Sequence, residues 1–269
     1  SDNLLAEYDG TSRKESHPLA RAAVENALAL DSGLAEAHTS LASLLMLSEW
    51  NWDGAEREFR LALSLNPNYA TARHWWAEWL SYHGRIGEAL QEMSRAAELD
   101  PLSPAILKDM GMLLYYARDY AGAIDHAMKA LELDRQFAAA HRLLSLAYQG
   151  KGMFAEAVEE NRRWGELTRN QPETAVGLAQ CYAAAGKREE AEALLEELKL
   201  ETVSSGNLCR GVAVVYAGLG EVALALTWLE RAFTHGADAL TTIRIDQKLD
   251  RLRGEPRYTA LLKQIGLAE

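Results

Sequence analysis

The sequence is poor in cysteine, with Cys181 and Cys209 the only two in 269 residues. Two widely separated cysteines can form neither the disulfide framework of a small secreted domain nor a Cys-x-x-Cys metal or redox motif. We interpret both as small apolar side chains of a core in a reducing compartment. The expected location is therefore cytoplasmic.

Basic residues and long apolar runs are also scarce. The chain has 28 Lys and Arg against 39 Asp and Glu, which gives a net charge of −11. Phosphate contacts need a surplus of positive charge, so non-specific binding to nucleic acid or to an anionic membrane is excluded. The longest apolar run, 211–220, is far shorter than the roughly 18 residues of a membrane span. No secretory signal opens the chain, and Ser1 in place of Met leads us to expect an excised fragment.

Catalytic and metal-binding motifs are lacking as well. The sequence contains no phosphate-binding loop of the Gly-x-x-x-x-Gly-Lys-Ser/Thr type, no Gly-x-Gly-x-x-Gly and no His-Glu-x-x-His. Its histidines are dispersed, so we expect structural or surface roles for them. The acidic run 189–197 alternates with leucines and is typical of a solvated helix face. The sequence therefore predicts no metal, no cofactor and no enzymatic activity.

A repeat of 34 residues is what the sequence does contain. Alanine recurs at this spacing six times: Ala55, Ala89, Ala123, Ala157, Ala191 and Ala225. Pairs of a large and a small residue recur with the same step, as in Trp76-Ala77 and Met110-Gly111. The first step of that series is 35, which places one inserted residue between Ala42 and Ala55. Self-similarity of this length is typical of repeat proteins.

Each unit has the period of two amphipathic helices. Apolar residues recur at steps of three and four, which indicates helix and not strand. Short breakers such as 83–85 and 151–152 separate the two helices, and Gly there supplies a left-handed residue that ends the first helix. Asn66-Pro67 and Asp100-Pro101 end the second helix. The small member of each pair allows another helix to approach closely.

These features resemble the tetratricopeptide repeat. In the unit 70–103 the pattern is met by Trp76-Ala77, Leu80, Gly84, Ala89, Met93, Ala96 and Pro101. The resemblance covers 35 to about 239, and it implies an all-α fold, a right-handed α-solenoid of helix-turn-helix repeats with a C-terminal capping helix. The expected organisation is a partial N-terminal repeat at 1–34, six repeats at 35–69, 70–103, 104–137, 138–171, 172–205 and 206–239, and a capping segment at 240–269, whose terminal helix starts at Pro256.

The family resemblance also implies where a partner would bind. In the family the first helix of each unit lines a concave groove. Carried onto this chain, the exposed groove positions select eight candidate residues: His74, Glu78, Tyr82, Lys108, Tyr115, Tyr116, Arg142 and Arg210. Tyrosines supply flat amphipathic contact area, and the cations can pair with carboxylates. The alternative, that each side chain only solvates or packs the groove, stays open at this point.

Two functions from different classes remain open. The first is a non-catalytic scaffold that binds a peptide segment or partner domain, acidic or aromatic-rich, in the groove. The second follows from a softer resemblance of 52–59 and 250–258 to repeat regions of bacterial signalling proteins. In that case the chain is the regulatory or sensor part of a transcription regulator, a Ser/Thr kinase or a nucleotide cyclase, and acts by self-association or ligand sensing. Trp50 and Trp52, beside the insertion, are expected to fold back over the adjacent repeat.

Overall fold

The computed structural model describes residues 13–268 apart from 201–202, 204 and 237. Within that part every regular element is helical, and no strand occurs. The chain divides at Pro101 into two compact units. None of the helices described is long and apolar enough to cross a membrane.

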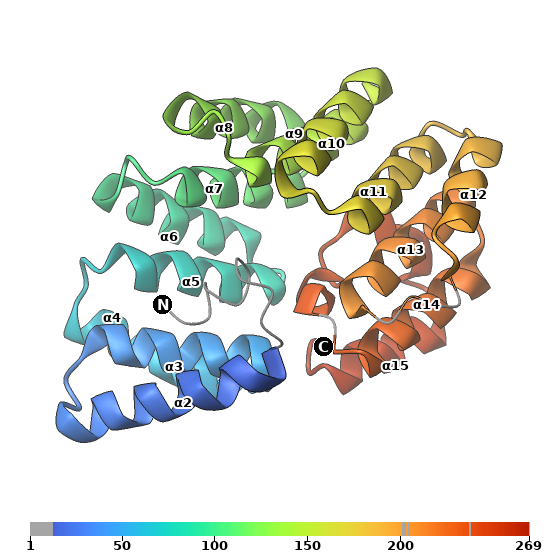
Figure 1. Cartoon of the computed structure of the whole chain (residues 1–269). Helices are drawn as coiled ribbons and strands as arrows, with labels where there is room; N and C mark the ends of the chain where they lie inside the picture. The colour runs from blue at the N-terminus through green and yellow to red at the C-terminus, as the bar shows by residue number, and fades with distance from the viewer. Residues whose placement is uncertain (1–12, 201–202, 204, 237, 269) are drawn as a thin grey trace. The chain divides into compact units, whose positions relative to one another are not determined.

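The described residues of unit 1, 13–101, form five helices: α2 (Arg13–Leu30), α3 (Ala35–Ser48), α4 (Trp52–Leu65), α5 (Ala70–Tyr82) and α6 (Ile86–Leu99). Unit 2 contains the remainder (Figure 1): α7 (Pro104–Tyr116), α8 (Tyr120–Leu133), α9 (Ala138–Gly150), α10 (Phe154–Thr168), α11 (Gln171–Ala184), α12 (Arg188–Glu197), α13 (Gly206–Leu219), α14 (Val222–Thr234), the 3₁₀ helices η2 (Asp238–Thr242) and η3 (Gln247–Leu252), and α15 (Pro256–Gln264).

The helices pack in consecutive pairs, α3 with α4 and α5 with α6 in unit 1, and α7 with α8, α9 with α10, α11 with α12 and α13 with α14 in unit 2. We call the two members of a pair the first and the second helix. The six alanines spaced by 34 residues lie on the second helices and are fully buried. Because a methyl group is the smallest side chain with a Cβ, these positions let the paired helices approach closely.

Turn chemistry fixes the ends of the helices. Asn51 and Asp119 cap α4 and α8, since their side chains accept hydrogen bonds from the backbone N–H groups of Gly54 (3.0 Å) and Gly122 (2.9 Å). Gly84 lies in the turn after α5 with φ 77°, a conformation that costs glycine little. The expected left-handed glycine after the first helix is confirmed there.

The inserted residue sits where the sequence places it, before α4. Trp50 has φ 47°, and Trp52 begins α4 with 6% of its surface exposed. The indole N–H of Trp79 donates to the backbone oxygen of Trp52 (3.1 Å), and the Trp52 ring meets those of Tyr82 and His83 edge-on. The expectation that this tryptophan covers the next repeat is confirmed for Trp52.

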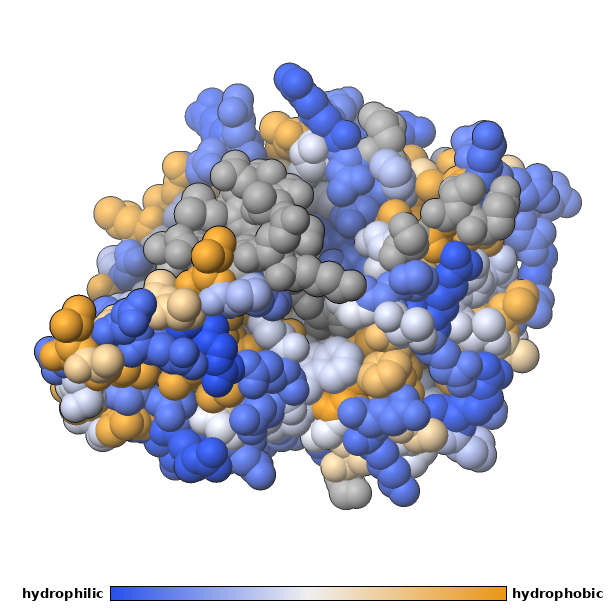
Figure 2. Space-filling model, turned by 60° about the horizontal axis from the view of Figure 1, so that its bottom comes forward, coloured by the Kyte–Doolittle hydropathy of each residue, from blue (hydrophilic) through white to orange (hydrophobic). Residues whose placement is uncertain are grey.

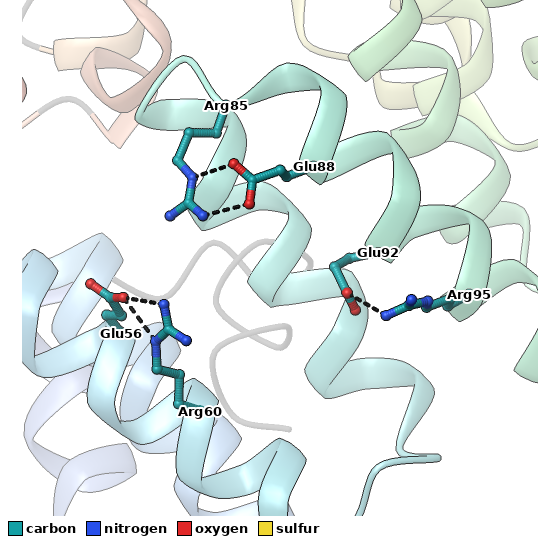
Figure 3. A network of polar contacts seen from close by, with 6 residues as sticks. All are labelled: Glu56, Arg60, Arg85, Glu88, Glu92 and Arg95. Carbon is teal, nitrogen blue, oxygen red and sulfur yellow. Dashed lines mark hydrogen bonds and ion pairs between the residues drawn. The ribbon is translucent and has the colours of Figure 1, made fainter.

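Charged side chains cover the second helices of unit 1. Arg60 pairs with Glu56 on α4 (2.7 Å), and Arg85 pairs with Glu88 at the start of α6 (2.6 Å), as Figure 3 shows. Glu56 also raises the pKa of Arg85, after the larger effect of Glu88. The face seen in Figure 2 is mostly hydrophilic, with apolar side chains in separate small groups. A surface of this kind agrees with a net charge of −11.

Candidate partner-binding surface

The first helices of each unit form what we call its first-helix surface. α3 contacts α5 in unit 1, while α7 contacts α9 and α11 contacts α13 in unit 2. The eight residues selected from the sequence all lie on such helices: α5, α7, α9 and α13. The structure thus distributes the candidates over the first-helix surfaces of both units.

In unit 1 the three candidates lie along α5 and interact with one another. The Tyr82 hydroxyl donates a hydrogen bond to Oε2 of Glu78 (2.8 Å), and Nε2 of His74 is 4.0 Å from Oε1 of the same carboxylate. The His74 ring stacks on Trp75 at a centroid distance of 5.8 Å. Tyr82 is buried, whereas His74 and Glu78 are half-buried. The carboxylate of Glu78 is therefore held between a phenol and an imidazole.

In unit 2 the candidate cations have neighbours of their own. The ammonium of Lys108 pairs with Asp109 on the same helix. The guanidinium carbon of Arg142 lies 4.7 Å from the centre of the Trp164 ring, a cation–π arrangement. Lys108, Tyr116 and Arg142 are all half-buried. Parts of these three side chains are thus within reach of a bound molecule.

A segment of the chain lies against the remainder of this surface. We call residues 240–252, which include most of η2 and all of η3, the C-terminal strap. η2 and η3 both contact α13, and η3 also contacts α14. Four apolar side chains of the strap are fully buried: Leu240, Ile243, Leu249 and Leu252. Tyr258 of α15 is buried behind the strap and donates its hydroxyl hydrogen to the Ile243 carbonyl (2.5 Å).

Polar contacts link the strap to α13, to α11 and to the turn after α7. Arg210 of α13 pairs with Asp246 at the start of η3. The ammonium of Lys248 donates to Oε1 of Gln180 on α11 (3.1 Å), and Nε2 of Gln180 donates to the Gly211 carbonyl of α13 (3.0 Å). Arg118, just after α7, pairs with Asp250. The strap is therefore tied to the first-helix surface from α7 to α13.

Burial and charge shift the pKa values of the groups at this contact. Burial lowers the pKa of Lys248 to about 8. The charge of Asp246 acts to raise this pKa, whereas the charges of Arg210 and Arg142 lower it further. Burial alone would raise the pKa of Asp246, but Lys248 and Arg210 outweigh it and the pKa is lowered. Burial also lowers the pKa of Arg142. Three cations thus surround one ionised carboxylate.

Two of the eight candidates are enclosed at this contact. Arg210 is 8% exposed beside Asp246, and Tyr115 is 2% exposed, with its pKa raised by burial and then by the Asp246 charge. Sequence reasoning missed Asp246 and Lys248 as members of this surface. The available signal was the spacing of Leu240, Ile243, Leu249 and Leu252, whose multiples of three match the 3₁₀ period.

Comparison with known proteins gives one relative in sequence. No family model matches the chain. Human tetratricopeptide repeat protein 13 is 30% identical over 102 residues, which amount to 38% of this chain and 12% of that protein. The matched region is thus a small part of the human relative.

Solved structures resemble the chain over most of its length. A tetratricopeptide repeat protein from Parabacteroides merdae ATCC 43184 matches with a TM-score of 0.65 and 18% identity, over 93% of this chain and 98% of that one. A chain of the APC/C hetero-tetramer Cut9–Hcn1 matches with a TM-score of 0.63 and 15% identity, over 98% and 51%. PilW, a type IV pilus biogenesis factor, matches with a TM-score of 0.61 and 21% identity, over 74% and 90%. The chain therefore has the all-helical tetratricopeptide-repeat fold.

Proposed function

We propose that the chain is a non-catalytic, cytoplasmic scaffold that binds a peptide segment or partner domain on its first-helix surface. The observation that carries the proposal is the C-terminal strap. In unit 2 this surface already holds a segment made of short 3₁₀ helices and the turn between them, through buried leucines and pairs between arginine and aspartate. A surface that binds such a segment in cis has the chemistry to bind one in trans.

The half-buried candidates define the chemistry of the proposed partner. Lys108 and Arg142 offer positive charge, and Tyr116 and the Trp164 ring offer aromatic area. Carboxylates pair well with such cations, and aromatic side chains stack on arginine and tyrosine. The proposed partner is accordingly a segment rich in acidic and aromatic residues. Self-association is a second mode that the same chemistry allows.

The fold and the cysteines support this proposal. One of the structural matches is a chain of the APC/C hetero-tetramer Cut9–Hcn1, so a protein with this fold does form a complex with another chain. Cys181 and Cys209 are free and buried, which suits a reducing compartment. Folds of stacked repeats commonly serve binding through an extended surface.

The test is a charge reversal on the first-helix surface. The 269-residue chain is applied to an array of immobilised peptides that vary in acidic and aromatic content. We expect acidic, aromatic peptides to be selected, and we expect Lys108→Glu with Arg142→Glu to weaken that binding by about a hundredfold, because an attractive pair becomes a repulsive one at two positions.

The matched control is Arg95→Glu with Lys129→Glu, which makes the same change in net charge on the exposed second helices α6 and α8. This control should bind as the unaltered chain does. Circular dichroism verifies that both variants are folded. The proposal fails if no peptide is selected, or if the two pairs of substitutions affect binding equally.

A further inference from the structure

One repeat position is shared by the first helices α7, α9, α11 and α13 of unit 2. It holds Lys108 on α7, Arg142 on α9, Val176 on α11 and Arg210 on α13, at steps of 34 residues. Equivalent positions of stacked repeats face the same surface, so these side chains follow one another along the first-helix surface. The surface therefore carries a cation at this position on α7, α9 and α13, whereas α11 has a valine.

The C-terminal strap supplies the cation that α11 lacks. The ammonium of Lys248 donates to Oε1 of Gln180 (3.1 Å), and Gln180 lies one helical turn after Val176 on α11. In the chain, α11 comes between the helices of Arg142 and Arg210. The charges of Arg142 and Arg210 both lower the pKa of Lys248, an effect that like charges have at short range. We call Arg142, Arg210 and Lys248 the cation cluster.

Arg142 is the cation whose head group is left without a polar partner. Lys108 and Arg210 each form an ion pair, and Lys248 donates a hydrogen bond. Within the residues that the structure describes, the Arg142 guanidinium forms neither, and its contact is the Trp164 ring, 4.7 Å from the guanidinium carbon. Arg142 is also half-buried, and burial lowers its pKa. Its five N–H donors are thus unused in this part of the chain.

A second donor of the cation cluster also lacks an acceptor. Nε of Arg210 is buried and forms no hydrogen bond with the residues that the structure describes, although Nη2 of the same guanidinium pairs with Asp246. Buried donors in folded proteins are nearly always hydrogen-bonded. A buried donor without a partner therefore points to an acceptor from outside the chain.

Positive charge is in excess at the cation cluster. Its three cations face two carboxylates, the buried Asp246 and the half-buried Glu173 of α11. Glu173 acts on Arg142 through its charge and forms no ion pair with it. A cation that is withdrawn from water without a counterion is costly, and a bound anion removes that cost. A guanidinium matches the oxygens of a carboxylate or a phosphate with its planar fork of donors.

We propose, on the basis of the scaffold function above, that the cation cluster binds a phosphorylated side chain of the partner segment, with Arg142 as the residue that contacts the phosphate. A phosphate monoester carries a charge of about −1.5 to −2 at neutral pH and has three acceptor oxygens. A carboxylate has one charge and two oxygens, so it uses fewer of the donors on Arg142 and Arg210. Clusters of arginine are a recurrent means of phosphate recognition. The Trp164 ring restricts the Arg142 side chain, which lowers the entropy lost on binding.

The test compares three peptides that differ in one residue. Each is an acetylated and amidated peptide with the sequence Gly-Tyr-Xaa-Tyr-Gly, in which Xaa is phosphoserine, glutamate or serine. Isothermal titration calorimetry measures the binding of each peptide to the 269-residue chain. We expect the phosphoserine peptide to bind at least about tenfold more tightly than the glutamate peptide, because the phosphate offers more charge and more acceptors.

Substitutions of Arg142 test its contact with the phosphate. Arg142→Gln should reduce the affinity for the phosphoserine peptide to that for the glutamate peptide. Arg142→Lys keeps the charge but loses the planar fork, so it should recover only part of the preference. The matched control is Arg162→Gln, which removes an arginine from an exposed position of α10 in the same unit and should leave binding unchanged. Circular dichroism verifies that the variants are folded.

Phosphorus NMR gives a second measurement. The second pKa of a free phosphomonoester is about 6, and nearby cations favour the doubly charged form. The pKa of the phosphoserine peptide should therefore be lower in complex with the chain than in solution. Arg142→Gln should reduce this shift, and Arg162→Gln should not.

The proposal is overturned if the phosphoserine and glutamate peptides bind equally, or if Arg142→Gln and Arg162→Gln have the same effect. It is also overturned, in favour of a small phosphate compound, if N-acetylphosphoserine amide binds as tightly as the phosphoserine peptide. Binding of the glutamate peptide with no gain from phosphate would refute this inference and leave the scaffold proposal intact. Binding of the phosphoserine peptide would support the inference even if the array of unphosphorylated peptides selected none.

Discussion

Arg210 on α13 pairs with Asp246 at the start of η3, across 36 residues of sequence. The side chains are 10% and 2% exposed, so the pair is almost completely removed from water. Asp246 also accepts a hydrogen bond from the backbone N–H of Lys248 (3.0 Å). A charge buried to this extent needs its partner, because an unpaired buried ion is strongly destabilising. The pair thus fixes the C-terminal strap to α13.

Replacing Asp246 with Asn should destabilise the protein by about 3–5 kcal/mol, since it leaves the Arg210 charge buried without its counterion. Thermal unfolding followed by circular dichroism measures the loss. The lowered pKa of Asp246 gives the loss a pH dependence. The ion pair contributes fully above about pH 3.9, the unfolded pKa, and its contribution disappears as pH falls through the folded value.

Asp250→Asn is the control for that experiment. Asp250 lies on η3, the helix that Asp246 caps, and pairs with Arg118 and Arg253, but its side chain is 37% exposed. Solvent screens exposed pairs, so we expect a loss below about 1 kcal/mol. Equal losses for the two variants would show that the Arg210–Asp246 pair does not anchor the strap.

Lys248 should make stability depend on pH in the alkaline range. Its pKa is about 8 in the folded chain and about 10.4 in an unfolded one. Between those values the unfolded state holds a proton that the folded state has released, so the free energy of unfolding rises with pH. The difference in stability between the chain and Lys248→Met should therefore rise from about pH 8 to about pH 10.4 and level off.

Urea unfolding at a series of pH values measures this difference. The matched control is Lys263→Met, which removes an exposed lysine of α15. Since both variants lose one lysine, effects of net charge cancel in the comparison. An identical pH profile for the two variants would contradict a buried, deprotonating Lys248.

Much of the fold could be predicted because the sequence of each repeat determines the structure of its own helix pair. Ala55 and Ala89 are fully buried where the 34-residue spacing placed a close helix contact. Gly84 has the left-handed conformation expected of the breaker that follows a first helix. These features depend on neighbours within one helix pair. Because the pattern occurs six times, a departure from it in one repeat does not hide it.

The strap could not be predicted in the same way. Residues 240–252 occur once, so the three-residue spacing of their apolar side chains is not reinforced by a second copy of the pattern. The contact between Lys248 and Gln180 joins positions 68 residues apart. The sequence around each residue does not indicate that the other is its partner. The candidate cations on first helices could be selected by analogy between repeats, but their neighbours, such as Trp164 beside Arg142, come from packing.

Gly111 should not tolerate a side chain, although it lies within helix α7. A Cβ there would come within 2.6 Å of Leu143 Cδ2 and 3.1 Å of the Ala123 carbonyl oxygen. Overpacking of this kind costs about 1–3 kcal/mol, against a gain of about 1 kcal/mol in helix propensity. We therefore expect Gly111→Ala to lower the midpoint of thermal unfolding.

Gly87 of α6 provides the opposite case. It is exposed, and a Cβ there would meet no atom within 4 Å beyond its neighbouring residues and the backbone of its own helix. Gly87→Ala should therefore raise stability by up to about 1 kcal/mol through helix propensity alone. If Gly111→Ala stabilised the chain as much as Gly87→Ala does, tight packing of α7 could not be the reason for glycine in the Met110-Gly111 pair.

His141 and Glu160 form a pair that recurs between first and second helices. Nδ1 of His141 is 2.6 Å from Oε2 of Glu160, and His38 and Glu58 repeat the contact at 2.6 Å. At the equivalent positions of α5 and α6 the pair is Arg73 with Glu92 (2.5 Å). A basic side chain on the first helix thus pairs with a carboxylate on the second helix. This basic side chain is histidine in two pairs and arginine in the third.

His141→Arg should accordingly keep most of the stability, because Arg73 already shows that the geometry accepts a guanidinium. His141→Leu should cost about 1–3 kcal/mol, since the half-buried Glu160 loses a hydrogen-bond partner. Chemical denaturation of both variants at pH 7 measures the two effects. Equal losses would mean that the shape of the imidazole matters and its hydrogen bond does not. Equal retention would mean that Arg163, which also reaches Glu160 at 3.3 Å, is sufficient to satisfy the carboxylate.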